Sequence, residues 1–222
     1  MGIISVENTD RLFWLGRYSE RVVTTLRLFA VSFDRMIDFD FNDYVEFCKE
    51  LDIPNIYTSK DDFVEKYLYD PENQDSLYAN LDRAFSNALV LREEIGSGTL
   101  SYIQLAEYAL TDAQKSKAPL IALQDVIDNL MSFWGAVDDD IDDRNVRNII
   151  KAGKRLERLD LYARLKRPRE ELFAAYRRLN IRIRETNLNF DEEGLDRILR
   201  MLNDEALHYR NIVAQTEEIV RQ

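Results

Sequence analysis

The sequence contains one charged pattern twice. Residues 16–21 read GRYSER and residues 153–158 read GKRLER, so both follow the pattern Gly-basic-x-x-Glu-Arg. A glutamate carboxylate can act as a general acid or base, and an arginine guanidinium can hold a carboxylate or phosphate through two parallel hydrogen bonds. The same residue types also form ion pairs that fix the packing of helices. The pattern therefore allows a charged pocket or a structural network, and the choice depends on the elements that carry the two copies.

Helical periodicity surrounds both copies. In the first, apolar or small residues recur every three or four positions from Leu12 to Phe33, which predicts a helix face that packs against the core. Glu20 lies away from that face and shares another face with Gly16, one turn earlier. Glu157 has the same relation to Gly153. We therefore expect each of these helices to be covered on two sides.

The two glycines predict a close approach. Glycine inside a helix is less favourable than alanine by roughly 1 kcal/mol, so we expect Gly16 and Gly153 to make room for another helix or a ligand. A glutamate on such a surface must be paired, because an isolated buried charge is very unfavourable. Arg21 and Arg158 project about 100° away from the glutamate that precedes them. They are therefore expected to meet a third element, or each other's glutamate across helices.

The two copies extend into a weak internal repeat. A shift of 137 positions, from 16 to 153, aligns six identical residues, among them Asn8 with Asn145 and Arg27 with Arg164. This register predicts two related helices, with an approximate two-fold axis between them as one arrangement. The match is too short to indicate a solenoid.

The whole chain predicts helices. Apolar residues follow a 3.6-residue rhythm almost throughout, and only 7 glycines and 4 prolines interrupt it. The expected helices are Asn8–Ile37 (capped by Asn8 or Thr9), Asn42–Leu51, Ser59–Leu68, Ser76–Ile95 (ending at Gly96–Gly98), Thr99–Ser116, Pro119–Val137, Asp143–Leu165, Pro168–Leu188 and Glu192–Val220. No Pro/Gly/Ser-rich linker divides them. We predict an all-α, single-domain multi-helix bundle over residues 1–222, with two pseudo-repeated long Gly-x-x-x-Glu-Arg helices.

Composition indicates a soluble, intracellular chain. Hydrophobic residues make up 45% of it, enough for a substantial core. The single cysteine, Cys48, excludes an internal disulfide and fits a reducing compartment. The amino terminus lacks a secretion signal, and no apolar run approaches the roughly 20 residues that span a bilayer. We expect a cytoplasmic protein without a membrane segment.

Charge is unevenly distributed. The net charge is −11, which argues against nucleic-acid binding because it would repel phosphates. Residues 151–184, however, hold 12 Lys/Arg against 4 Asp/Glu. This basic island includes Arg164, Lys166, Arg167, Arg169, Arg177, Arg178, Arg182 and Arg184. It is either a solvated helix face or a docking surface for an acidic partner or substrate.

Three other patterns are weak candidates for chemistry. Residues 138–143 read DDDIDD and contain the spacing D-D-x-x-D twice, which can hold a magnesium–diphosphate group, but no convincing second acidic motif accompanies it. Glu205 and His208 form the E-x-x-H half of a di-iron site, but that site needs two histidines and the chain has one. No Gly-x-Ser-x-Gly motif supports a catalytic triad. The residues therefore predict neither a metal site nor a cofactor.

Three segments carry a resemblance to a known family. NTDRLFWLGRYSER (8–21), GKRLERLD (153–160) and, more loosely, ANLDRAFSNALVLREEI (79–95) are similar to the alpha-E family, a bacterial, predicted all-helical domain with a Glu-Arg motif. The chain departs from the family pattern at Glu93, where aspartate is expected, and at Tyr102, where tryptophan is frequent. The matching segments supply the candidate pocket or interaction residues, which are Asn8, Arg11, Trp14, Arg17, Glu20, Arg21, Arg92, Glu93, Lys154, Glu157, Arg158 and Asp160.

The resemblance implies a biological context. Alpha-E domains tend to be encoded beside, or fused to, circularly permuted ATP-grasp ligases and transglutaminase-like proteins, which implies a pathway that forms or modifies peptide or amide bonds. The first hypothesis is a non-catalytic module that docks on an ATP-grasp-type ligase or presents its substrate. The second is an enzyme of the same pathway, with Glu20 or Glu157 as the acid/base group and the arginines holding a charged small molecule or peptide.

Overall fold

The computed structural model describes residues 4–38 and 42–220. Over these residues the chain is all-α, and an isolated bridge between Phe190 and Val220 is the sole extended pairing there. The helices are α1 (Val6–Asp38), α2 (Asp43–Leu51), α3 (Lys60–Tyr69), α4 (Leu77–Val90), α5 (Arg92–Lys115), α6 (Pro119–Asp139), α7 (Arg144–Arg164), α8 (Arg169–Ile183), α9 (Glu192–Asn203) and α10 (Tyr209–Glu217).

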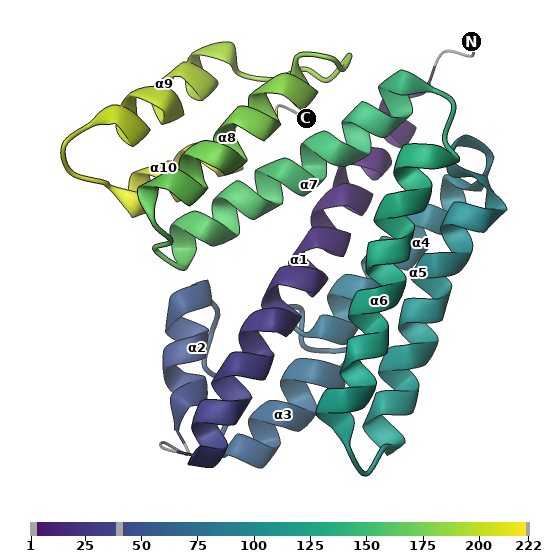
Figure 1. Ribbon diagram of the computed structural model, residues 1–222, viewed down its shortest axis with the longest axis vertical. Helices are drawn as coiled ribbons and strands as arrows, with labels where there is room; N and C mark the ends of the chain where they lie inside the picture. The colour runs from purple at the N-terminus through teal and green to yellow at the C-terminus, as the bar shows by residue number, and fades with distance from the viewer. Residues whose placement is uncertain (1–3, 39–41, 221–222) are drawn as a thin grey trace.

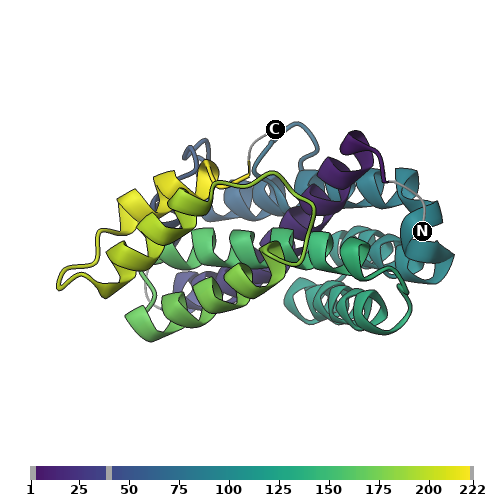
Figure 2. The same cartoon turned by 90° about the horizontal axis from the view of Figure 1, so that it is seen from above.

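The crossing of α1 and α7 organises the molecule. These two helices form the most extensive helix–helix contact, and each carries one Glu-Arg pattern (Figure 1). Helices α4 and α6 contact α1 and carry α5 between them, whereas α8 and α10 contact α7 and carry α9 (Figure 1). In the view from above, α4 and α10 lie on one side of the crossing and α6 and α8 on the other (Figure 2). The two sides of the crossing therefore face different neighbours.

Helix α1 is buried on two sides, as its sequence predicts. The core-facing residues from Leu12 to Phe29 are fully buried, and Phe33 at the end of that stripe is partly buried. Phe13 and Glu20, on the second face, are also buried. The first face packs mainly against the bundle of α4, and the second meets α7. Burial on both faces explains why a helix with so many charged residues stays in the centre of the fold.

The two helices touch backbone to backbone at the predicted glycines. A Cβ atom on Gly16 would lie 2.0 Å from the carbonyl oxygen of Ile150, and one on Gly153 would lie 2.0 Å from that of Phe13. Real Cβ atoms do not approach carbonyl oxygens so closely, so each position accepts only glycine at this helix separation. The close approach expected from the sequence is confirmed, and its partner is the other Glu-Arg helix.

Several helix ends differ from the sequence prediction, among them that of α8, which ends at Ile183 and not at Leu188. Helix α1 begins two residues before Asn8, because the Ser5 side chain accepts the Asn8 amide at 3.0 Å and caps the helix instead. The helix expected to reach Ile95 ends at Val90, and a new turn starts at Arg92. Gly96 does interrupt the helix as predicted, with a φ of 78°, but within the span of α5.

The expected helix Glu192–Val220 is wrong as a single element. It is two helices, α9 and α10, separated by the segment after Asn203. The Arg169 guanidinium donates to the carbonyl oxygens of Leu202 and, at 3.0 Å, Glu205. These bonds satisfy carbonyls at the end of α9 that a continuing helix would use itself. A long-range contact therefore ends the helix where apolar periodicity continues.

An aromatic cluster fixes the opposite end of α1. Phe29 stacks with Tyr67 of α3 at a ring-centroid distance of 6.1 Å, and Phe47 of α2 meets the same tyrosine edge-on at 4.8 Å. Phe63 lies between these rings. Tyr67 is fully buried, so this aromatic cluster is part of the core. This cluster anchors α2 and α3 to the end of α1 that lies far from the glycine crossing (Figure 1).

Alanine substitutions at glycines should separate the crossing from ordinary helix propensity. Gly153→Ala is expected to destabilise the fold by about 1–3 kcal/mol, because its Cβ would force two backbones apart. Gly135→Ala, near the C-terminal end of α6 and with nothing within 4 Å of a new Cβ, is expected to stabilise by about 0.5–1 kcal/mol. Urea unfolding of both variants measures the difference. Equal effects at the two positions would contradict the close crossing.

Candidate functional site

The Glu-Arg patterns pair reciprocally across the crossing. The Nε atom of Arg21 donates to Oε1 of Glu157 at 2.5 Å, and the Nε atom of Arg158 donates to Oε1 of Glu20 at 2.5 Å. Glu20 and Glu157 are 0% and 1% exposed. Each arginine therefore compensates the buried carboxylate of the opposite helix. The prediction that Arg21 and Arg158 meet each other's glutamate is confirmed.

The two carboxylates are not equally satisfied. Glu157 also receives the Nε atom of Arg17 on Oε2 at 2.7 Å, so both of its oxygens are paired. The residue that aligns with Arg17 in the second pattern is Lys154, and no hydrogen bond joins Lys154 to Glu20 in the described chain. Thr24 donates to Oε1 of Glu20 at 3.1 Å, whereas Oε2 of Glu20 has no hydrogen-bond partner among the described residues. We call the Glu157 side of the crossing the closed side, because both carboxylate oxygens are paired, and the Glu20 side the incomplete side.

The arginines hold Glu157 in its ionised form. Burial of Glu157 opposes ionisation, but the charges of Arg17 and Arg21 outweigh it and lower the pKa of this carboxyl. The pKa of Arg21 is raised in return, mainly by Glu157. Asp160, one turn further along α7, behaves differently: burial and then the charge of Glu157 raise its pKa. The pKa values of these two neighbouring acids are therefore shifted in opposite directions.

Lys154 and Arg155 lie in a cation-rich environment on the incomplete side. Burial lowers the pKa of Lys154 to about 7, against the opposing attraction of Glu20. Its Nζ atom lies 3.6 Å from the ring centroid of Trp134 on α6. Burial, and then the positive charges of Arg158 and Arg178, lower the pKa of Arg155 to about 10. Cations exceed anions here, although the whole chain is acidic.

A groove of about 690 Å³ lies on the Glu157 side of the crossing, beside Arg17 and Arg21. It is bounded by α1, α4, α7 and the α10 end of the chain. Its lining residues are Asp10, Phe13, Trp14, Arg17, Tyr18, Arg21, Gln74, Asp75, Asn80, Arg83, Leu156, Thr216, Glu217 and Val220. The groove therefore combines three arginines, three carboxylates and three aromatic rings, a composition that suits a ligand with charges of both signs.

Aromatic rings position the arginines of the groove. The guanidinium of Arg17 lies 4.7 Å from the ring centroid of Trp14, and Trp14 packs on Tyr18 with 5.3 Å between centroids. Arg83 of α4 lies 5.8 Å from the Tyr18 ring and donates to the carbonyl oxygen of Gln74 at 2.9 Å. Because Arg17 and Arg21 bind Glu157 through Nε, their outer nitrogens remain available to a ligand in the groove.

Asp160 ties the crossing to the last helix. It accepts Nε of Arg164 at 2.8 Å and the hydroxyl of Thr216 at 3.0 Å. Arg164 in turn pairs with Glu217 at 2.8 Å. Asp160 is 0% exposed, so it is a structural anchor for α10 and does not line the groove.

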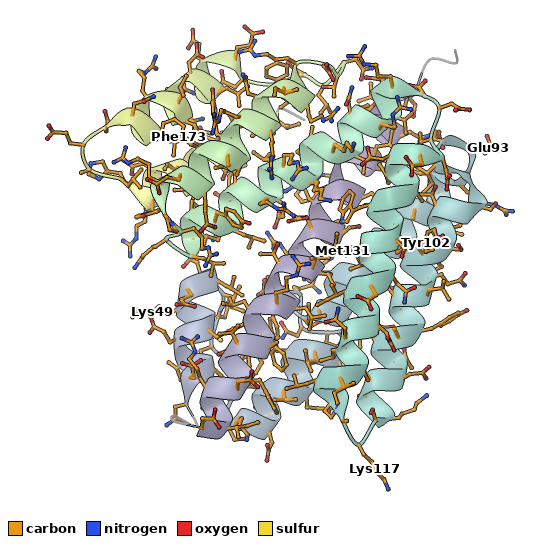
Figure 3. The ribbon with its side chains drawn as sticks, in the orientation of Figure 1. Lys49, Glu93, Tyr102, Lys117, Met131 and Phe173 are labelled. Carbon is orange, nitrogen blue, oxygen red and sulfur yellow. The ribbon has the colours of Figure 1, made fainter. Side chains whose placement is uncertain are left out.

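The remaining candidate residues lie away from the ion pairs. Asn8 donates to Glu94 at 2.5 Å, and Arg11 pairs with Glu7 at 2.7 Å. Arg92 is exposed and donates to Ser97 at 2.9 Å. Glu93 lies at the periphery of the molecule (Figure 3). The middle matching segment therefore adds no charge to the crossing.

Most of the basic island is neutralised locally. Arg164, Arg167, Arg182 and Arg184 have carboxylate partners, and Arg169 donates to carbonyl oxygens. This supports the interpretation of a solvated, ion-paired face for these residues. Arg178 differs, because it contributes to the cation excess around Arg155.

The acidic run and the lone histidine have ordinary structural roles. Asp138 pairs with Lys151, and the Asp143 side chain accepts the Asn145 amide at 2.8 Å and caps α7. His208 is exposed just before α10. Within residues 4–38 and 42–220, no three His, Cys, Asp or Glu side chains converge as a metal site would require.

Several residues of the site were not singled out by the sequence patterns. Tyr18 and Arg155 occupy unspecified positions of the Gly-basic-x-x-Glu-Arg pattern, Arg83 lies in the loosely matching segment 79–95, and Trp134 and Thr216 come from helices without such a pattern. The spacing of Trp14 and Tyr18 could have indicated an aromatic wall of the site, because residues four positions apart lie on one helix face. The others depend on which helices pack beside the crossing.

The fold and site together define an all-helical domain built on two crossed Glu-Arg helices. A profile of the alpha-E family, described as a predicted alpha-helical domain with a conserved ER motif, matches residues 8–217. The chain belongs to the alpha-E family. No curated protein matches the chain, and no solved structure does. None of the helices in the described ranges combines the length and apolar character of a membrane span.

Removal of the Glu157 charge should be costly. Glu157→Gln is expected to destabilise by about 3 kcal/mol, the lower range for a broken buried pair, because Arg21 remains 32% exposed and keeps some hydration. The matched control is exposed Glu93→Gln, with an expected change within about 0.5 kcal/mol.

The same variant has an expected pH dependence. The pKa of Glu157 is lower in the folded protein, so its contribution is complete above the unfolded pKa of about 4.3 and disappears as pH falls through the folded value. Urea midpoints of wild type and Glu157→Gln should therefore differ by a constant amount above about pH 5 and converge below it. A difference that grows in acid would show that Glu157 is not held ionised.

Proposed function

We propose that this protein is a helical partner module in an ATP-grasp-type peptide or amide ligation pathway, where it docks a ligase or presents its substrate. The pathway rests on the association of alpha-E domains with circularly permuted ATP-grasp ligases and transglutaminase-like proteins. The observation that carries the role is the groove beside Arg17 and Arg21, which has charges of both signs next to stacked aromatic rings. A peptide segment with its own acidic and basic groups fits such a surface.

The two glutamates are committed to structure. Both are buried and paired, and Glu157 is surrounded by two arginines that keep it ionised. A general acid must release a proton near neutral pH, and a carboxyl with a lowered pKa holds none there. This favours a binding role for the groove, with Glu157 fixing the geometry of Arg17 and Arg21 and the outer guanidinium nitrogens meeting the partner.

The alternative is an enzyme of the same pathway that uses this groove for a charged small molecule or peptide. The specific observation in its favour is the volume of about 690 Å³, which suits a small ligand. Turnover by the purified chain alone distinguishes this alternative from the partner role.

Alanine variants of Arg21 or Arg158 would test folding and binding together, because each leaves a buried glutamate with less compensation. Arg83 and Tyr18 are better probes. Arg83 lies on the rim of the groove without an ion pair among the described residues, and its side chain contacts Tyr18 and Gln74. A change at Arg83 alters the groove and leaves the buried pairs intact.

The test is a native pull-down from the source cells with tagged full chain, wild type or Arg83→Glu, followed by identification of retained proteins and small molecules by mass spectrometry. We expect wild type to retain an ATP-grasp-type ligase and Arg83→Glu to weaken its retention about tenfold or more, through reversal of one charge at the interface. The control is exposed Arg177→Glu, on a different face.

Recovery of wild type alone with an anionic or zwitterionic small molecule would replace the partner role by the enzyme alternative. Equal retention of a ligase by wild type and Arg83→Glu would place the docking surface outside the groove and contradict the proposal.

A further inference from the structure

The side of the crossing opposite the groove carries an unfinished version of the same ion-pair arrangement. Arg17 closes the cluster around Glu157 by binding Oε2, and Lys154 stands in the aligned position beside Glu20. Both cations lie over a tryptophan, Arg17 over Trp14 at 4.7 Å and Lys154 over Trp134 at 3.6 Å. Each side therefore has a cation over a tryptophan and beside a glutamate. The cation is an arginine on one side and a lysine on the other, and the lysine ammonium has one nitrogen where the guanidinium can reach two acceptors.

Two buried polar atoms lack partners on this side. Oε2 of Glu20 and Nε1 of Trp134 make no hydrogen bond among the described residues, although Glu20 is 0% and Trp134 is 4% exposed. Buried polar atoms are nearly always satisfied, so each of these two calls for a partner of the opposite kind. The Glu20 oxygen needs a donor, such as the Lys154 ammonium or a water, whereas the Trp134 N–H can donate to an anion. Lys154, itself 8% exposed, lies between the helices that carry them. The elements concerned are α1, α6 and α7.

Positive charge exceeds negative charge around Lys154. On α7, Lys151, Arg155 and Arg158 all disfavour its charged form. Of these, Lys151 pairs with Asp138 of α6 and Arg158 with Glu20 of α1. Arg155 forms neither an ion pair nor a side-chain hydrogen bond within the described residues.

Helix α8 adds to the excess. The positive charges of Arg178 and Arg182 disfavour the charge of Arg155, and among the described residues Arg182 has a carboxylate partner, Glu185, whereas Arg178 has none. In Figure 3, Met131 marks the place where α6 lies beside α1 on this side. Arginines crowded in this way are relieved by an oxyanion, which can accept from several donors at once.

We propose that Lys154, Arg155 and Arg158 form an anion-binding site at the junction of α1, α6 and α7, which takes the oxyanion group of a small molecule, a carboxylate or a phosphate. Arg155 and the outer nitrogens of Arg158 donate to the oxyanion, and Lys154 supplies a third positive charge. The site lies on the opposite face from the groove, so it is separate from the role proposed above and does not depend on it.

Anion binding at this site is coupled to proton uptake. Without a bound anion, the pKa of Lys154 is about 7. Burial, Arg155, Arg158 and Lys151 lower this pKa, and Glu20 raises it. A bound anion favours the ammonium form and raises that pKa, so the anion binds more tightly at pH 6, where the amine is already protonated, than at pH 8. For a pKa that rises from about 7 to well above 8, the affinity changes about tenfold between these two pH values.

The experiment is isothermal titration of the full chain with sulfate, whose charge is constant between pH 6 and pH 8. We expect affinity to fall about tenfold from pH 6 to pH 8 in wild type. Lys154→Arg copies the Arg17 side, remains charged throughout, and is expected to bind with a similar affinity at both pH values. Arg155→Gln removes an unpaired surface cation and is expected to weaken binding at least about fivefold at both pH values.

Arg83→Gln, in the groove on the other face, is the matched control and should leave sulfate affinity and its pH dependence unchanged. Displacement of sulfate by glutarate or by methyl phosphate at pH 8 distinguishes a carboxylate from a phosphate ligand. The proposal is overturned by an absence of sulfate binding, by the same affinity at pH 6 and pH 8 in wild type, by an unchanged affinity in Arg155→Gln, or by failure of both competitors. Circular dichroism of each variant confirms that it is folded before titration.

Discussion

The structure depends on the backbone contact between Gly16 and Gly153. The carbonyl oxygens of Phe13 and Ile150 lie 2.0 Å from where Cβ atoms would stand, so α1 and α7 are too close for any residue but glycine at these positions. This separation brings each Glu-Arg pair within hydrogen-bond reach of the opposite helix, at 2.5 Å on both sides. A wider crossing would leave two carboxylates buried without partners, which is among the most unfavourable changes a core can undergo. The ion pairs therefore require the close crossing, and the close crossing requires the two glycines.

The ion pairs also divide the molecule into two faces with different chemistry. On the α4 and α10 side, two arginines saturate Glu157 and leave their outer nitrogens to a groove with aromatic walls. On the α6 and α8 side, a lysine replaces one arginine and the neighbouring cations outnumber the anions. A single exchange of arginine for lysine has this effect because guanidinium reaches two acceptors in a plane, whereas ammonium is a compact charge that loses its proton when buried.

Much of this arrangement could be predicted from residue types. A glycine inside each amphipathic helix indicated a close approach, and a buried glutamate one turn later required a cation from elsewhere. Reciprocal pairing of Arg21 and Arg158 was one of the two arrangements that this predicted, and the structure has it. Helix periodicity defined most elements, and it failed where a distant residue decided the outcome. Arg169 ends α9 by donating to the carbonyl oxygen of Leu202, and Asp160 holds α10 by accepting the Thr216 hydroxyl. Both contacts join segments more than 30 positions apart. Trp134 and Arg83 entered the site for the same reason, because only packing places α6 and α4 beside the crossing.

The separation in sequence between the crossed helices has a consequence for synthesis. Arg21 and Glu157 lie 136 positions apart, so α1 leaves the ribosome long before α7 exists. Until then its glycine face and Glu20 lack their partners on α7, and α1 can pack only against helices made earlier, chiefly α2 and α4. Contacts of such long range form late and slow the final assembly. Completion of the centre of this domain therefore awaits one of the later helices to be made.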